Sequence, residues 1–168
     1  MKKLLFAANN LELGGIETAL VTLLNNLIKE GKYEITLALE SKQGMFLAEL
    51  DKRIQVIEYQ TSKMKFTPLR KMINLMKRLA FAREYKNQFD FSAAFATYSL
   101  PAGFMARVAS NNCALWIHAD YLSLYHGDKE KVRSFFESVH HAQYKHLVFV
   151  SKEAMESYLE LFPQYKNK

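Results

Sequence analysis

The chain has 168 residues, of which 49% are hydrophobic, a net charge of +6 and one cysteine, Cys113. This length predicts a single domain with one substantial core, and the lone cysteine excludes an internal disulfide and favours a reducing cytoplasm. The apolar run near the N-terminus, Leu4–Ala8, is too short for a secretory signal, and no stretch approaches the roughly 18 apolar residues of a membrane span.

Short β-like runs alternate with amphipathic helical patterns along the chain. We expect strands over residues 3–8, 33–40, 54–59, 91–97, 113–118 and 146–150. We expect helices over residues 16–30, 45–50, 68–86, 101–109, 128–144 and 152–161. This alternation predicts an α/β fold in which a Rossmann-like, largely parallel β-sheet is flanked by helices on both faces, as a three-layer α/β/α arrangement. The domain is expected to cover residues 1–162, and the polar segment 163–168 is expected to begin a linker.

The positive charge is concentrated in one segment. Residues 63–86 carry eight Lys or Arg and one acid, Glu84, for a local charge of +7, whereas residues 1–62 and 87–168 sum to −1 and 0. A basic patch of this kind indicates an anionic partner.

The helix expected over residues 68–86 would present two different faces. We assign its core face to Leu69, Met72, Ile73, Met76 and Ala80. We predict that a membrane-facing arc lies opposite and contains Arg70, Lys71, Lys77, Arg78, Phe81 and Tyr85. Cations interleaved with aromatic residues suit an anionic membrane surface. An ordinary solvated helix face is the alternative, and no nucleic acid is expected because no nucleic-acid module is recognisable.

Two glycines, Gly14 and Gly15, precede the first helix, and Glu17 lies in its first turn. Parallel sheets bind ligands at the carboxyl ends of their strands. The candidate sites are therefore this loop, the loops at 97–100 and 118–127 and the turn at Ser151. Glycines let the backbone approach a ligand, and a helix N-terminus offers N–H groups to a phosphate or a developing oxyanion. A tight strand-to-helix turn is the alternative for the glycine pair. Glu17 is interpreted as mainly structural, because the helix dipole favours a carboxylate there.

His118 ends the fifth expected strand, and Asp120 follows two residues later. An imidazole can donate or accept a hydrogen bond at such a position, or it can be a satisfied histidine at a strand end. For Asp120, orienting His118, binding an acceptor hydroxyl and starting a turn all remain open. His140 and His141 are adjacent and lack the spacing of a helical metal pair, so no metal is expected.

The order of these motifs resembles the N-terminal domain of retaining glycosyltransferases of the two-Rossmann-domain (GT-B) type, known as glycosyltransferase group 1 or family four. The resemblance is carried by Gly14-Gly15-Ile16-Glu17, by Trp116-Ile117-His118-Ala119-Asp120 and by Val148-Phe149-Val150-Ser151-Lys152. It covers the entire chain, and the closing Leu161–Lys168 resembles the stretch just before the family's interdomain linker.

The resemblance implies the acceptor-binding half of a retaining, hexosyl-type transferase. Such an enzyme moves a sugar from a nucleotide-sugar donor to a cell-surface polysaccharide, such as a capsule, or to a lipid-linked glycan acceptor. His118 would hydrogen-bond the donor sugar and help to stabilise charge as its bond to the nucleotide breaks. The other residues implied to bind donor or acceptor are Gly14, Gly15, Asp120, Ser151 and Lys152.

The resemblance also sets expectations for the rest of the protein. The donor-binding motif would lie in an absent C-terminal domain, so this chain alone is expected to be inactive. No cofactor or metal is implied beyond the nucleotide-sugar substrate. The protein is expected in the cytoplasm, peripherally associated with the inner face of the plasma membrane.

Two functions of other classes remain open. One is a non-catalytic membrane-docking partner of a separate donor-binding chain. The other is a flavodoxin-like domain that binds a small ligand. The glycine loop itself is neither a dinucleotide fingerprint nor a P-loop, since neither G-x-G-x-x-G nor a following Gly-Lys-Ser/Thr is present.

Overall fold

Six strands form one parallel sheet in the computed structural model, which describes residues 1–12 and 14–168. The strands are β1 (Lys2–Ala8), β2 (Tyr33–Leu39), β3 (Gln55–Glu58), β4 (Phe91–Ala94), β5 (Cys113–Ile117) and β6 (His146–Phe149). Their order across the sheet is β3-β2-β1-β4-β5-β6, and every neighbouring pair is parallel. From β1 to β3, successive strands are added on one side, whereas β4 to β6 are added on the other. The strand order therefore reverses between β1 and β4, which pair at the centre of the sheet.

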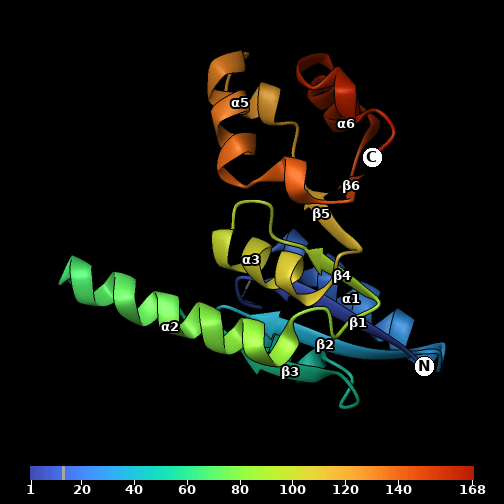
Figure 1. Ribbon diagram of the computed structural model, residues 1–168. Helices are drawn as coiled ribbons and strands as arrows, with labels where there is room; N and C mark the ends of the chain where they lie inside the picture. The colour runs from blue at the N-terminus through green and yellow to red at the C-terminus, as the bar shows by residue number, and fades with distance from the viewer. Residues whose placement is uncertain (13) are drawn as a thin grey trace.

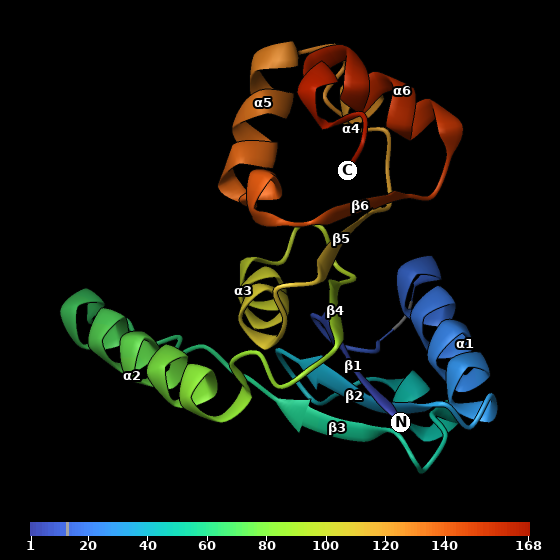
Figure 2. The ribbon, with the colours of Figure 1, turned by 45° about the vertical axis from the view of Figure 1, so that its right-hand side comes forward.

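Helices cover both faces of this sheet (Figure 1). They are α1 (Gly15–Lys29), α2 (Thr67–Tyr85), α3 (Leu100–Ala109), α4 (Tyr121–Leu124), α5 (Lys129–Ser138) and α6 (Lys152–Leu161). Three short 3₁₀ helices are η1 (Met45–Glu49), η2 (His141–Gln143) and η3 (Pro163–Tyr165). Figure 2 shows α1 on one face, α2 and α3 on the other, and α4, α5 and α6 grouped beyond β5 and β6. The predicted three-layer α/β/α fold is confirmed, and no helix in the described part of the chain is long and apolar enough to span a bilayer.

Alternating side chains of β1 divide the core into two layers. Leu4 and Phe6 belong to the layer that α1 covers, whereas Leu5 and Ala7 belong to the layer that α3 covers. All four are at most 7% exposed. A central strand that is buried on both faces has a continuous apolar sequence, which explains the run at Leu4–Ala8.

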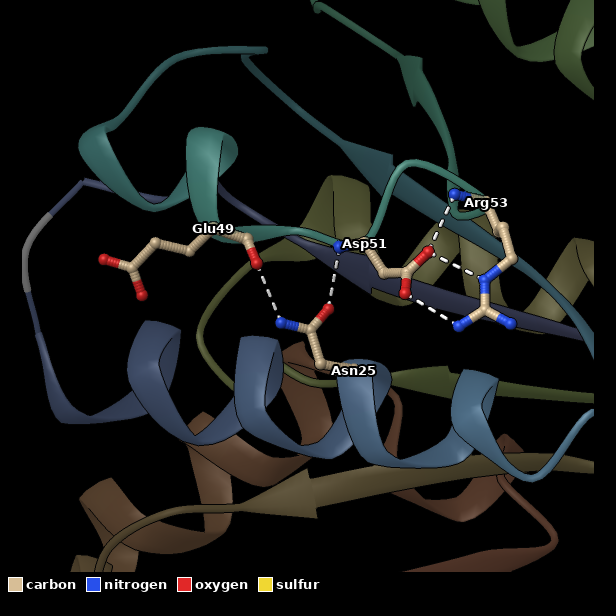
Figure 3. Close-up of polar contacts among 4 residues, drawn as sticks. All are labelled: Asn25, Glu49, Asp51 and Arg53. Atoms are coloured by element: carbon tan, nitrogen blue, oxygen red, sulfur yellow. Dashed lines mark hydrogen bonds and ion pairs between the residues drawn. The ribbon is translucent and has the colours of Figure 1, made fainter.

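The side-chain amide of Asn25 fastens α1 to the connection between η1 and β3 (Figure 3). Its Nδ2 donates to the carbonyl oxygen of Glu49 and its Oδ1 accepts from the backbone N–H of Asp51, both at 2.8 Å. The guanidinium of Arg53 donates two hydrogen bonds to the Asp51 carboxylate, at 2.9 and 2.7 Å, and holds the pKa of that carboxyl well below its usual range. These contacts fix the position of α1 against the β3 side of the sheet.

Helix α2 docks by the opposite face from the one predicted. Phe81 is only 6% exposed, and the centre of its ring lies 5.3 Å from that of Tyr59 and 5.9 Å from that of Phe104. Tyr85 packs beside Phe81 at 4.8 Å. The prediction that Phe81 and Tyr85 face a membrane is therefore wrong. Large aromatic rings bury more apolar area than flexible methionines do, so they set the orientation of the helix.

Polar contacts hold α2 in the same orientation. Asn74 Oδ1 accepts from the backbone N–H of Ser62 at 2.7 Å, and Lys77 Nζ donates to the carbonyl oxygen of Gln60 at 2.6 Å. The guanidinium of Arg78 lies over the ring of Phe104 at 5.4 Å. Lys77 and Arg78, predicted to face a membrane, thus contact the body of the domain.

The residues assigned to the core face of α2 lie largely in solvent. Met72 and Met76 are 53% and 62% exposed, and Ala80 is also exposed, so the core assignment is wrong for these three. Leu69 and Ile73 are half-buried.

The helix predicted over residues 128–144 is two elements. Helix α5 ends at Ser138, and His140 adopts the left-handed region with φ of 56°, which breaks the helix before η2 begins. The break turns His141 inward, where it is 5% exposed and its Nδ1 lies 2.6 Å from the hydroxyl of Tyr158.

The segment predicted to begin a linker, residues 163–168, folds back onto the domain. The carbonyl oxygen of Lys168 accepts a hydrogen bond from the backbone N–H of Leu147 in β6 at 3.2 Å, and its Nζ donates to the carbonyl oxygen of Ala142. Tyr165 packs against the core layer that α3 covers. The role of residues 163–168 as a linker stays a prediction.

Candidate functional site

The carboxyl ends of β1, β4 and β5 meet at one edge of the sheet, beside the reversal of strand order. Backbone hydrogen bonds continue the pairing past the strand ends, such as Phe95 N–H to the Ala7 carbonyl at 2.8 Å. In open parallel sheets this edge is where ligands bind. The loop before α1, the loop after β4 and the end of β5 therefore form the candidate site.

Neither glycine of the Gly14-Gly15 pair is required by the backbone. Gly14 is the N-cap of α1 with φ of 169°, an extended conformation that any residue adopts, and Gly15 has no positive φ. Among the described atoms, a Cβ on Gly15 would meet nothing within 4 Å, and one on Gly14 would meet only the flexible end of Glu17. Neither position therefore needs glycine for a special backbone conformation, and open space lies beside Gly15.

Glu17 belongs to the same edge, although it was interpreted as mainly structural. Burial lowers the pKa of His118, and the negative charge of Glu17 opposes that shift. Burial raises the pKa of Tyr98, and the same carboxylate adds to that shift. Residues from the first turn of α1, from the loop after β4 and from the end of β5 therefore share one electrostatic environment. The sequence signal for Glu17 was its place in the first turn, two residues after Gly15.

His118 is held by the loop that follows β4. Its Nε2 lies 2.7 Å from the carbonyl oxygen of Phe95, and the two rings pack with centres 4.7 Å apart. A carbonyl oxygen only accepts, so Nε2 carries the proton and Nδ1 of the neutral ring is bare. Nδ1 makes no hydrogen bond within the described residues, where no buried side-chain nitrogen or oxygen is left without a partner. Among the described atoms, the bare nitrogen is therefore accessible rather than sealed in the core.

The charge state of His118 follows from its surroundings. Burial lowers its pKa below 6.5, while the hydrogen bond to Phe95 and the charge of Glu17 act in the opposite direction without cancelling the shift. The ring is therefore neutral at pH 7, with a single free acceptor at Nδ1. One nitrogen meets the expectation of a satisfied strand-end histidine, and the other is available to accept a hydrogen bond from a hydroxyl.

The loop after β4 contributes residues that were not singled out in the sequence. Thr97 donates its hydroxyl to the carbonyl oxygen of Trp116, and the hydroxyl of Ser99 donates to the Glu40 carboxylate at the end of β2. These contacts leave Tyr98, between them, 50% exposed at the edge of the sheet. A lone tyrosine after a strand carries no motif, so only the pairing of β4 between β1 and β5 reveals it.

Asp120 starts a helix. Its carboxylate accepts from the backbone N–H groups of Leu122 and Ser123 at 3.0 and 3.3 Å, and from the Ser123 hydroxyl at 2.6 Å. Burial favours the neutral acid, but these hydrogen bonds outweigh it and leave the pKa of Asp120 below its ordinary value. The turn-starting interpretation is thus confirmed. Among the described residues, Asp120 makes no hydrogen bond to His118 and so does not orient its ring.

Ser151 and Lys152 lie at the end of β6. The hydroxyl of Ser151 caps α6 by accepting from the backbone N–H of Ala154 at 3.1 Å. Lys152 pairs with Glu156 one turn along the helix, at 3.4 Å. Among the described residues, no hydrogen bond or ion pair joins these two residues to His118. Their binding role stays a prediction. No group of three or more His, Cys, Asp or Glu residues in residues 1–12 and 14–168 forms a metal-binding cluster.

A solved structure with a similar fold is the crystal structure of Anabaena Alr3699/HepE in complex with UDP and glucose. The match has a TM-score of 0.65 at 14% sequence identity, and it covers 96% of this chain and 41% of that chain. The chain thus spans less than half the length of this structural neighbour. No protein-family model and no curated protein matches the sequence. At this identity, the likeness shows a shared fold.

Proposed function

We propose that this chain is the acceptor-binding half of a glycosyltransferase that moves a sugar from a nucleotide-sugar donor to a glycan or lipid-linked acceptor. UDP and glucose, bound in the structural neighbour, are the two parts of a nucleotide sugar. The observation that carries the proposal in this chain is the bare Nδ1 of neutral His118, held at the ligand-binding edge of the sheet.

Three groups at this edge have complementary chemistry. The N-terminus of α1 offers N–H groups to a phosphate or a developing oxyanion, and the space above Gly15 lets a ligand approach its backbone. Nδ1 of His118 accepts a hydrogen bond from a sugar hydroxyl, and the Tyr98 hydroxyl can donate or accept one. Groups fixed before the substrate arrives stabilise a transition state without reorganising.

The finer parts of the proposal rest on the sequence resemblance. They are retention at the anomeric carbon, a hexose as the transferred sugar, a cell-surface polysaccharide or lipid-linked glycan as acceptor, and a donor site on a second domain. The coverage of the structural neighbour, 41% of its chain, is consistent with a donor site that lies elsewhere. Asp120, Ser151 and Lys152 remain proposed acceptor contacts at the neighbouring strand ends.

Calorimetry with a panel of UDP- and GDP-sugars tests this division of labour. The chain alone should bind them with dissociation constants no tighter than the millimolar range and should not release the nucleotide. A micromolar complex with the isolated chain would contradict a donor site on another domain.

The same purified chain distinguishes this proposal from the two functions of other classes. A separate donor-binding chain that co-purifies but gives no sugar transfer would favour a non-catalytic docking partner. A small cofactor bound in a one-to-one ratio would favour a flavodoxin-like domain.

A further inference from the structure

Helix α2 exposes a stripe of large apolar side chains. Met72, Leu75, Met76 and Leu79 are 53%, 56%, 62% and 62% exposed. Their spacing of three, one and three residues places them on one side of the helix, which we name the outer α2 face. Figures 1 and 2 show α2 extending outward past β3, with its N-terminal half farthest from the sheet.

The outer α2 face is a fixed surface, because the opposite side of the helix is anchored. Phe81 is buried among aromatic rings, and Asn74 and Lys77 hold the connection after β3 by hydrogen bonds. Turning the helix to hide the apolar stripe would break all of these contacts. The exposure of the stripe is therefore a consequence of how the domain packs.

Two further apolar residues precede the helix. Met64 and Phe66 are 42% and 65% exposed. With the outer α2 face they make six large apolar side chains exposed within residues 64–79. Large exposed apolar areas on a soluble domain mark interaction sites.

Exposed cations border the apolar stripe. Lys71 lies one turn before Leu75, and Arg83 lies one turn after Leu79. Lys63 and Lys65 flank Met64. None of the ion pairs found in the described residues involves a cation of the segment 63–86, so its local charge of +7 is not neutralised there.

We propose that the outer α2 face, with Met64 and Phe66, docks the domain onto an anionic bilayer surface. The apolar side chains enter the boundary between headgroups and acyl chains, while Lys63, Lys65, Lys71 and Arg83 stay at the level of the lipid phosphates. This combination of an apolar stripe and unpaired cations fits a surface that is both apolar and anionic. A second copy of the chain would bring two segments of charge +7 together, which like-charge repulsion opposes.

The docking surface replaces the predicted membrane-facing arc. Of that arc, Lys71 belongs to the new surface and Arg70 is half-buried. The other four residues contact the domain: Lys77, Arg78, Phe81 and Tyr85. The surface shares no residue with the candidate sugar site, so failure of one proposal leaves the other standing.

Cosedimentation with vesicles tests the proposal. The chain should bind vesicles of phosphatidylglycerol and phosphatidylcholine in equal parts, should bind far less to pure phosphatidylcholine, and should be released by added salt. The combined variant Leu75→Gln, Met76→Gln and Leu79→Gln should lower binding at least about tenfold. Because these side chains are exposed, the circular dichroism and Tm of the variant should match those of the wild type.

Matched control variants test whether vesicle binding depends on where the exposed residues lie or only on how many are removed. Met45→Gln, Leu100→Gln and Leu124→Gln remove three exposed apolar residues from other elements and should leave binding within about twofold. Changing Lys63, Lys65, Lys71 and Arg83 to Gln should abolish binding, whereas changing the exposed Lys29, Lys42, Lys145 and Lys166 to Gln should largely preserve it.

Three results would overturn the proposal. The first is equal recovery with anionic and neutral vesicles. The second is unchanged binding in the outer-face variant. The third is a wild-type chain that forms a dimer in sedimentation velocity and does not bind vesicles, together with an outer-face variant that stays monomeric. This result would assign the face to a second copy of the chain.

Discussion

Nε2 of His118 donates a hydrogen bond to the carbonyl oxygen of Phe95 across 2.7 Å. This contact fixes the tautomer of the ring, because the carbonyl oxygen cannot donate. The second nitrogen is thereby committed to accept a hydrogen bond at the edge of the sheet where ligands bind. The functional proposal depends on this relationship between the end of β5 and the loop after β4.

Replacing His118 should impair transfer without unfolding the domain. In an enzyme that contains both halves, His118→Ala should lower kcat roughly ten- to a thousandfold, as expected when one preorganised polar contact is lost. His118→Asn keeps one donor and one acceptor and should recover part of the loss. Near-normal turnover in His118→Ala, measured by nucleotide release, would assign this residue to structure alone.

Substituting Gly15 separates a structural role from a ligand-binding one. The fold has room for a Cβ there and no positive φ to strain it, so Gly15→Ala should keep stability or raise it by about 0.4 to 1 kcal/mol. If a ligand approaches the backbone at this point, the same variant should bind a sugar at least about tenfold more weakly. Unchanged sugar binding would remove the glycine from the site, and a large drop in Tm would show that the fold requires it.

At Gly44, unlike Gly15, we expect a substitution to destabilise the fold. The Gly44 backbone has φ of 122°, and a Cβ would lie 1.9 Å from the Leu11 carbonyl oxygen. Gly44→Ala must therefore shift backbone and should lower the free energy of unfolding by about 1 to 3 kcal/mol or more. Gly127→Ala has a positive φ of 81° but open space, so it should cost less. Equal Tm values for the two variants would contradict the collision at Gly44.

His141 should make stability fall in acid. Burial lowers its pKa from 6.5 to about 4, with the charge of Lys168 acting in the same direction. Between these values the unfolded chain binds a proton that the folded chain excludes, so the free energy of unfolding rises with pH through this window and falls as pH is lowered. Burial of His118 acts with the same sign.

Urea unfolding at several pH values checks this account of His141. His141→Phe should flatten the dependence relative to the wild type. Tyr158→Phe removes the hydroxyl that contacts His141 but keeps the ring, so it should retain most of the slope. An identical slope in wild type and His141→Phe would show that other groups cause the acid sensitivity.

The sequence predicted the sheet well because each strand and helix has its own hydrophobic period and its own turn residues. It could not orient α2, since the stripe with Met72 and Met76 and the arc with Phe81 and Tyr85 are both apolar enough to face a core. Only the rings of Tyr59 and Phe104, distant in sequence, decide between them.

The candidate site could be predicted only in part, because some of its features depend on contacts between distant segments. Gly14, Gly15 and His118 stand in recognisable places at strand ends and a helix start. The state of His118 depends on Phe95, and the presence of Tyr98 depends on the strand order, so neither follows from local pattern. The left-handed residue His140, which divides one predicted helix into two elements, also carries no sequence signal of its own.

A nuclear magnetic resonance titration of the ¹⁵N-labelled chain with UDP- and GDP-sugars tests the proposed sugar site most directly. Amide shifts should gather at Gly15, Glu17, Tyr98 and His118, and they should saturate only in the millimolar range. Shifts centred on another face of the domain, or shifts that saturate at micromolar sugar nucleotide, would contradict the account.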